Sequence, residues 1–281
     1  MHAVIQFPEI SPNLFAFTIG GFEIALRWYA LGYIVGILFA RWIVLAALRR
    51  PTLWPNDKPP MTAEQLESLM TWIIIGIIAG GRLGYVLFYA DWAWWADPLR
   101  ILRVWEGGMS FHGGFLGVVI SGLVFCLRVK IPLVPAGDAF ALGTPMGLLL
   151  VRLANFINAE LWGRETTVPW GVIFPSDDFA RHPSQLYEAF GEGLVLFVIL
   201  TYLAFRTNGL KKTGLLLGIF LFGYGLVRFL VEFVRQPDAQ FQGTDNPIGY
   251  ALQLGEWGLT MGQILSLPMI LFGLYTFMRC R

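Results

Sequence analysis

Apolar residues along this chain gather into seven long runs, which short polar stretches separate. The runs cover residues 24–48, 66–89, 109–127, 136–157, 186–205, 213–234 and 259–278. Each is close to the roughly 20 apolar residues that a helix needs to cross the hydrocarbon core of a bilayer. The pattern predicts an all-α polytopic membrane protein with seven transmembrane helices. A capping box between Thr62 and Gln65 is expected at the start of the second span.

The composition supports this class and excludes others. Of the 281 residues, 56% are hydrophobic and only 14% are charged, against about 25% charged residues in a typical soluble domain. The net charge of +1 is too balanced for a nucleic-acid-binding protein, which carries a basic face. Cys126 and Cys280 form no metal-binding pattern with histidines, so we expect no metal ion.

Basic residues in the connections predict the orientation, because cytoplasmic loops are enriched in Lys and Arg. Alternate connections hold ten basic residues on one side, which are Arg49, Arg50, Lys58, Arg128, Lys130, Arg206, Lys211, Lys212, Arg279 and Arg281. The other side holds five, which are Arg100, Arg103, Arg164, Arg181 and Arg235. We therefore expect the C-terminus in the cytoplasm and the N-terminus outside.

The outer connections are the long ones. We expect residues 158–185 and 235–258 to form a small extracytoplasmic cap on a single membrane domain that spans residues 1–281, with a short strand within 167–174. Residues 1–22 lack the basic region and the cleavage site of a signal peptide, so we expect a retained interfacial segment.

Five arginines fall inside the predicted spans, where an arginine at the helix centre costs about 2.5–3.5 kcal/mol on insertion scales. They are Arg27, Arg41, Arg82, Arg152 and Arg228. Arg82, Arg152 and Arg228 lie about 8–11 Å below the outer end of their helices, at a rise of about 1.5 Å per residue. Such arginines are candidates for function. The competing interpretation of all three is that they reach the interface and form private ion pairs, and it applies most to Arg82.

Polar residues accompany two of these arginines. Arg152, Asn155 and Asn158 recur every three residues, and Tyr224, Arg228 and Glu232 recur every four, so each set lies along one helix stripe. Tyr29 and Glu160 lie at the same outer level. Buried groups of this kind need partners, or a ligand that supplies them.

His112 opens the third predicted span among Gly107, Gly108, Gly113 and Gly114. Histidine takes up a proton near neutral pH, and glycines allow a substrate to approach the backbone closely. A packed or interfacial histidine is the competing interpretation. Two arginines can hold a phosphate through paired hydrogen bonds. Phosphate ligands and a proton acceptor at the outer level predict chemistry on a phospholipid headgroup.

Two other classes remain open on these residues alone. Arginines inside the membrane also occur in transporters of anionic substrates, although transporter sites lie near the bilayer midplane. A protein that binds phospholipid without chemistry would carry the same ligands.

Four stretches resemble the bacterial phosphatidylglycerol–prolipoprotein diacylglyceryl transferases. They are GGMSFHGGFLG at 107–117, RLANFINAELWGR at 152–164, RHPSQLYE at 181–188 and GYGLVRFLVEFVRQPDAQF at 223–241. The resemblance implies transfer of the diacylglyceryl group of phosphatidylglycerol to the lipobox cysteine of a prolipoprotein, with release of glycerol 1-phosphate. This is the first step of lipoprotein maturation at the bacterial inner membrane, and it uses no cofactor.

The resemblance also implies roles for individual residues. Arg152 would bind phosphatidylglycerol, and Arg228 is the second essential arginine. With His112 and Tyr29 they form the expected catalytic set, and the expected substrate-binding residues are Arg152, Asn155, Glu160, Gly163, Tyr224 and Glu232. Two positions depart from the signature of the family, which usually has glycine where this chain has Val151 and Ala154. Neither departure removes a polar group.

Overall fold

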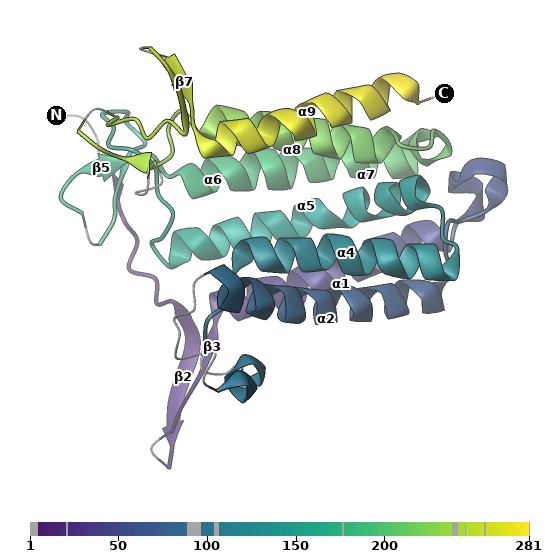
Figure 1. The fold of residues 1–281 in the computed structure, drawn as a ribbon, viewed down its shortest axis with the longest axis horizontal. Helices are drawn as coiled ribbons and strands as arrows, with labels where there is room; N and C mark the ends of the chain where they lie inside the picture. Colours follow the sequence, from purple (N-terminus) through teal and green to yellow (C-terminus); the bar gives the residue numbers. More distant parts are fainter. Residues whose placement is uncertain are drawn as a thin grey trace.

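Apolar helices lie side by side along one direction and form a bundle (Figure 1). The computed structural model describes residues 5–20, 22–88, 97–103, 107–175, 177–237, 241–244, 246–255 and 257–280. Its helices are α1 (Trp28–Leu48), α2 (Ala63–Phe88), α4 (Phe111–Val129), α5 (Leu133–Ile157), α6 (Ser184–Glu188), α7 (Leu196–Arg206), α8 (Leu215–Val231) and α9 (Met261–Arg279). A π-helical segment, η5 (Ala189–Val195), joins α6 to α7 without a break.

Among the described residues, six helical segments are long and apolar enough to cross a membrane, and α8 is a shorter apolar helix. Only helices satisfy every backbone polar group internally when a segment crosses a bilayer in this way. The coarse prediction of a polytopic helical membrane protein is therefore confirmed. Each of the seven predicted runs coincides with one of these segments. The capping box is also present, since Thr62 and Gln65 exchange two hydrogen bonds of 2.8 and 3.2 Å.

The chain is mostly helical but not all-α, and the start of the first predicted span is wrong. Residues 24–27 belong to strand β3 (Phe22–Arg27), which pairs antiparallel with β2 (Asn13–Ile19). The helix begins only at Trp28. This hairpin leaves the end of the bundle and runs across the helix direction (Figure 1). Part of the segment 1–22, which was expected to be interfacial, is therefore strand.

The two connections predicted to lie outside, 158–185 and 235–258, meet one another at the same end of the bundle. Strand β4 (Val172–Ile173) pairs with β1 (Ile5–Gln6) and β5 (Ala180–Arg181) in one small sheet, so the strand expected within 167–174 is present. Arg164 of the first connection donates to the Arg235 carbonyl of the second at 2.9 Å. A second hairpin, β6 (Leu252–Leu254) with β7 (Trp257–Leu259), precedes α9.

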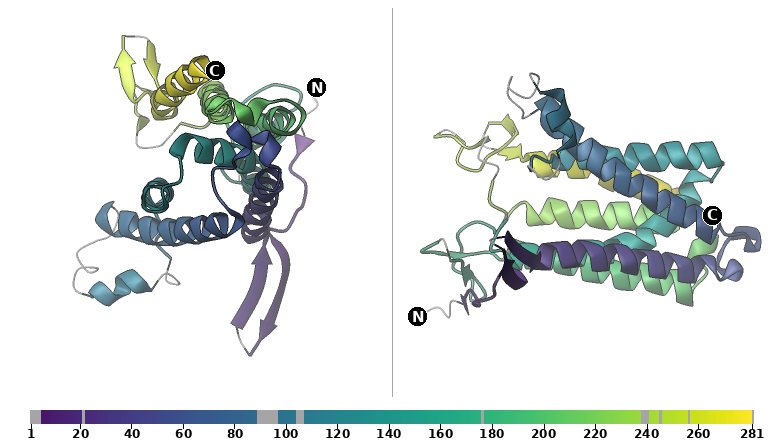
Figure 2. Two further views of the ribbon diagram at one scale, coloured as in Figure 1. Left: turned by 90° about the vertical axis from the view of Figure 1, so that its right-hand side faces the viewer. Right: turned by 90° about the horizontal axis from the view of Figure 1, so that it is seen from below.

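Close glycine contacts set the arrangement of α2 and α4. Gly76 and Gly80 of α2 face Gly117 and Gly113 of α4, and a Cβ at Gly76 would lie 2.5 Å from the Gly117 carbonyl oxygen. Small residues spaced by four allow such approach between membrane helices. Figure 2 shows α2, in blue, crossing the other helices at an angle.

Candidate functional site

Three arginines converge on one buried carboxylate near the outer connections. Glu188 of α6 lies 3.2 Å from Arg152 of α5, 3.3 Å from Arg228 of α8 and 3.5 Å from Arg235, which follows α8. The Glu188 side chain is only 1% exposed. A buried charge of this kind is stable only when it is paired and hydrogen-bonded. We call Arg152, Arg228, Arg235, Glu188, Glu192 and Glu232 the arginine–carboxylate cluster.

The π-helical segment brings a second carboxylate to the same place. Glu192 is fully buried, and one of its oxygens lies 3.6 Å from Arg152. Glu188 and Glu192 are four residues apart, so the helix presents both along one face. Single π turns inside helices are rare and frequently mark functional sites.

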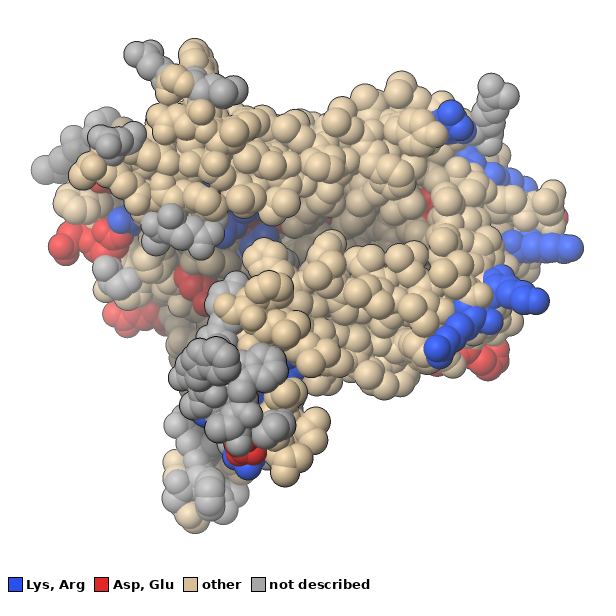
Figure 3. All heavy atoms as spheres, in the orientation of Figure 1, with Lys and Arg blue, Asp and Glu red and all other residues tan. Residues whose placement is uncertain are grey.

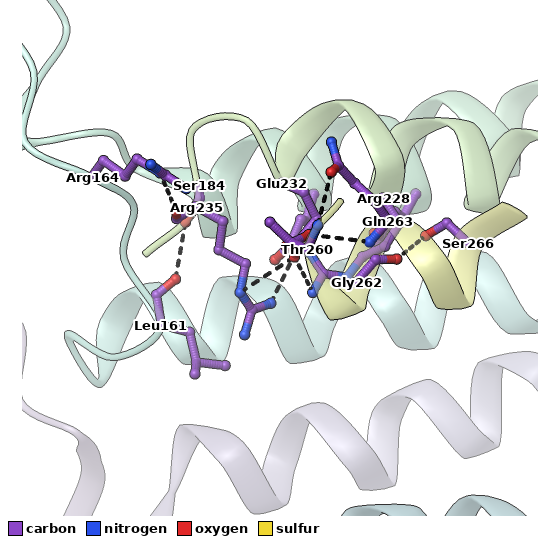
Figure 4. Close-up of polar contacts among 12 residues, drawn as sticks. Leu161, Arg164, Ser184, Arg228, Glu232, Arg235, Thr260, Gly262, Gln263 and Ser266 are labelled. Carbon is purple, nitrogen blue, oxygen red and sulfur yellow. Dashed lines mark hydrogen bonds and ion pairs between the residues drawn. The ribbon is translucent and has the colours of Figure 1, made fainter. Parts of the chain in front are cut away.

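Glu232 holds the opposite side of Arg228. Its carboxylate lies 2.5 Å from Arg228 and accepts a hydrogen bond of 2.6 Å from the Thr260 hydroxyl at the start of α9. Figure 4 shows Arg228, Glu232 and Arg235 beside this end of α9. Burial and the neighbouring Arg228 charge lower the pKa of Arg235 from its ordinary value, because desolvation disfavours the charged form.

A hydrogen-bonded layer lies one helix turn beyond Arg152. The Asn155 amide donates to the Tyr29 hydroxyl at 3.1 Å and to the Glu160 carboxylate at 2.7 Å. Gln185 of α6 donates to the Glu160 carbonyl at 2.5 Å. Tyr29 lies in the first turn of α1. The structure therefore brings Tyr29, Asn155 and Glu160 together, as their common outer level predicted.

Gly163 and Tyr224 have clear places in the fold. A Cβ at Gly163 would lie 2.7 Å from the His182 Cβ and would clash with the Val234 carbonyl, so Gly163 permits the close approach of the two outer connections. Tyr224 lies one turn before Arg228 in α8, and its ring is 5.9 Å from that of Phe220. Substrate binding by both residues stays a prediction.

His112 occupies the first turn of α4 with an exposed side chain. In the described part of the chain, the ion pairs of Arg152 and Arg228 go to glutamates of other elements, whereas His112 belongs to α4. The interpretation of Gly113 as open to substrate is wrong. A Cβ there would lie 2.9 Å from the Gly84 Cα of α2, so Gly113 serves helix packing.

Arg82 has a different role from Arg152 and Arg228. Its side chain is buried and donates to the carbonyls of Arg100, Ile101, Arg103, Gly107 and Gly108. It thereby fastens the connection between α2 and α4. These backbone contacts set Arg82 apart from Arg152 and Arg228, which pair with glutamates.

Sequence reasoning missed three members of the cluster. Glu188 and Glu192 lie within the predicted span 186–205, and the rule that marks intramembrane arginines applies equally to carboxylates. Their four-residue spacing would have placed them on one face. Arg235 was placed one turn beyond Glu232 and counted among the basic residues of the connections, but it was not predicted as a site residue.

The face of the molecule shown in Figure 3 is hollowed between the upper helices, which include α8 and α9, and the lower ones, which include α4. Lys or Arg side chains are visible at the left end of this hollow. Charged side chains are therefore visible from this face, on which most of the surface belongs to uncharged residues.

Fold and site together define a polytopic membrane protein with an arginine–carboxylate cluster near one end of its helices. A family model described as "Prolipoprotein diacylglyceryl transferase" matches residues 14–279. The chain belongs to the prolipoprotein diacylglyceryl transferase family.

Curated relatives match over nearly their whole length. A phosphatidylglycerol–prolipoprotein diacylglyceryl transferase of Cereibacter sphaeroides (strain ATCC 17029 / ATH 2.4.9) is 56% identical, covering 99% of this chain and 98% of the relative. Relatives with the same name from Roseobacter denitrificans and Brucella anthropi are 54% and 48% identical. They cover 100% and 99% of this chain, and 99% and 94% of their own lengths.

Proposed function

We propose that this transferase moves the diacylglyceryl group of phosphatidylglycerol to the lipobox cysteine thiol of a prolipoprotein and releases glycerol 1-phosphate. This is the first step of lipoprotein maturation. The convergence of Arg152, Arg228 and Arg235 on Glu188 carries the proposal. It places three guanidinium groups, which can form paired hydrogen bonds with phosphate oxygens, side by side near one end of the helices.

The headgroup phosphate binds between Arg152 and Arg228. Guanidinium groups match phosphate oxygens through paired hydrogen bonds, and both side chains come from helices that fix their position. Glu188 holds the arginines in place while the site is empty. Tyr29, Asn155, Glu160, Gly163, Tyr224 and Glu232 position the headgroup or the arginines.

The transfer step is a displacement at the glyceryl carbon. The cysteine thiolate forms a C–S bond to this carbon as its C–O bond to the phosphate breaks, and the electron pair leaves with glycerol 1-phosphate. Negative charge grows on the leaving group, so Arg152 and Arg228 stabilise it in the transition state. His112 takes the proton of the thiol, which is mostly protonated at pH 7.

The protein lies in the bacterial inner membrane with seven spans and its site toward the periplasm. The basic residues of the connections support this orientation, and Figure 3 shows Lys and Arg side chains gathered at the end of the bundle where α9 ends. The connections 158–185 and 235–258 then form a periplasmic cap on one membrane domain. Both membrane-borne substrates reach the site laterally through the hollowed face.

A defined transfer assay tests the proposal. Purified protein in detergent is mixed with phosphatidylglycerol and a lipobox peptide, and the peptide mass and the free glycerol phosphate are followed together. We expect a diacylglyceryl mass gain matched by glycerol phosphate, with neither product from a peptide whose cysteine is replaced by serine. Lipid binding without either product would contradict the proposal and favour a lipid-binding protein.

A further inference from the structure

The Glu232 carboxylate joins the end of α8 to the start of α9. Its Oε1 lies 2.5 Å from Arg228 and 3.9 Å from Arg235. Its other oxygen, Oε2, accepts the hydrogen bond of the Thr260 hydroxyl at 2.6 Å. Each oxygen therefore has its own partner, which fixes both the position and the plane of the carboxylate. Glu232 and Thr260 are both buried.

Thr260 is well suited to hold this carboxylate. It is the N-cap of α9, and its hydroxyl accepts the Gln263 backbone N–H at 3.2 Å while donating to Glu232. Gln263 completes the capping box by accepting the Thr260 backbone N–H at 3.1 Å. The N-terminus of a helix also favours a nearby negative charge.

Gly262 leaves the space that the carboxylate fills. A Cβ at this position would lie 2.5 Å from Glu232 Oε1 and 2.9 Å from its Cγ. The atoms in the way belong to the flexible end of a side chain. An alanine here would therefore displace the carboxylate and leave the helices in place. Figure 4 shows Gly262 directly beside Glu232.

We propose that Thr260 and Gly262 are positioning residues for Arg228 and act through Glu232. This inference rests on the proposed function, in which Arg228 binds the phosphate. Phosphate recognition through paired hydrogen bonds depends on the orientation of the guanidinium plane. A displacement of about 1 Å at a supporting residue is enough to reduce turnover strongly.

Three variants test this inference at equal amounts of folded enzyme in the transfer assay. Thr260→Val removes the hydroxyl but keeps the side-chain shape, Thr260→Ser restores the hydroxyl, and Gly262→Ala pushes on the carboxylate. Gln263→Ala is the control for Thr260→Val, because it weakens the same helix cap without touching Glu232. Gly122→Ala is the control for Gly262→Ala, because no atom lies within 4 Å of its added Cβ.

We expect Thr260→Val and Gly262→Ala to lower kcat/KM about tenfold to hundredfold, the range for losing a hydrogen bond to a charged group. The KM for phosphatidylglycerol rises in both variants, because the Arg228 guanidinium is no longer oriented to form paired hydrogen bonds with the phosphate. Thr260→Ser and both controls stay within about twofold of the wild type.

Two results would overturn the inference. Wild-type kinetics in Thr260→Val and Gly262→Ala would show that Glu232 needs neither contact. A smaller amount of folded protein, with kcat/KM and KM of the folded enzyme unchanged, would show a purely structural role. Failure of the proposed function is distinguishable, since the wild-type protein itself would then yield no glycerol phosphate.

Discussion

At the scale of single residues, Glu188 is the shared partner of Arg152, Arg228 and Arg235. The three cations repel one another, and the buried carboxylate between them offsets that repulsion. Glu192 and Glu232 each pair with some of these arginines, but among the described residues only Glu188 contacts all three.

Glu188→Gln is expected to destabilise the fold and to abolish most transfer. Removing one partner of a buried ion pair leaves the other charge uncompensated, which costs about 3–5 kcal/mol. Thermal unfolding in detergent and kcat/KM measure the two effects. Glu67→Gln is the control, because Glu67 pairs with Arg41 and both side chains are more than 40% exposed. Equal behaviour of the two variants would contradict the central place of Glu188.

Arg228→Lys tests the need for paired hydrogen bonds. Lysine keeps the charge but offers a single ammonium group, which cannot form the guanidinium fork. We expect kcat/KM to fall about tenfold or more, since a charged hydrogen bond is lost. Near-normal kcat/KM in this variant would show that charge alone suffices.

His112→Ala tests the proposed proton acceptor. Turnover is expected to fall by about 10²-fold or more, the usual contribution of general base catalysis. Raising the pH toward 9 should recover part of the loss, because more of the acceptor thiol is then ionised without help. The pH profile of kcat is the measurement, and wild-type turnover in His112→Gln would argue against this role.

The cost of burying charge predicted the arginines of the site and could have predicted its glutamates. Arg152 and Arg228 were singled out by their depth and by their polar neighbours, and both enter the cluster. Arg82 lies at a similar depth but binds carbonyls of the chain itself. Depth cannot separate these roles, because it does not tell which partner faces each arginine.

At the scale of elements, the contact between α2 and α4 depends on glycine. Gly80→Leu is expected to lower the free energy of unfolding by about 1–3 kcal/mol, because the added side chain forces the two backbones apart. Thermal unfolding in detergent measures the loss. Gly122→Leu on α4 is the matched control, since its Cβ meets no atom within 4 Å. If both variants melt alike, the glycine contact does not set this packing.

The hairpin β2–β3 shows why the start of the first helix was missed. The run from Ile24 is apolar enough to extend a span, and hydropathy alone does not distinguish strand from helix. In the sequence, Gly20–Gly21 separates the two strands. Two glycines between apolar runs are a typical hairpin signal, which would have predicted the turn. The other helices were predicted to within a few residues because bilayer thickness fixes their length.

At the scale of the whole molecule, the proposed orientation places Cys280 in the cytoplasm. A membrane-impermeant maleimide should label Cys280 in inside-out vesicles and not in right-side-out ones. Burial raises the pKa of the Cys280 thiol, so less thiolate forms at a given pH and labelling should accelerate as the pH rises above 8. In the Cys280→Ser variant only Cys126 remains, which is buried. Labelling of this variant therefore measures the contribution of Cys126. Labelling of Cys280 only in right-side-out vesicles would contradict the proposed orientation and indicate the reverse one.

The central claim is that the arginine–carboxylate cluster holds the phosphate of the lipid. A structure of the protein with a phosphonate analogue of phosphatidylglycerol, whose scissile oxygen is replaced by carbon, tests it most directly. We predict phosphonate oxygens within about 3 Å of the guanidinium nitrogens of Arg152 and Arg228, a charge-assisted hydrogen-bond distance. A phosphonate bound elsewhere, with Arg152 and Arg228 still paired only with glutamates, would contradict this claim.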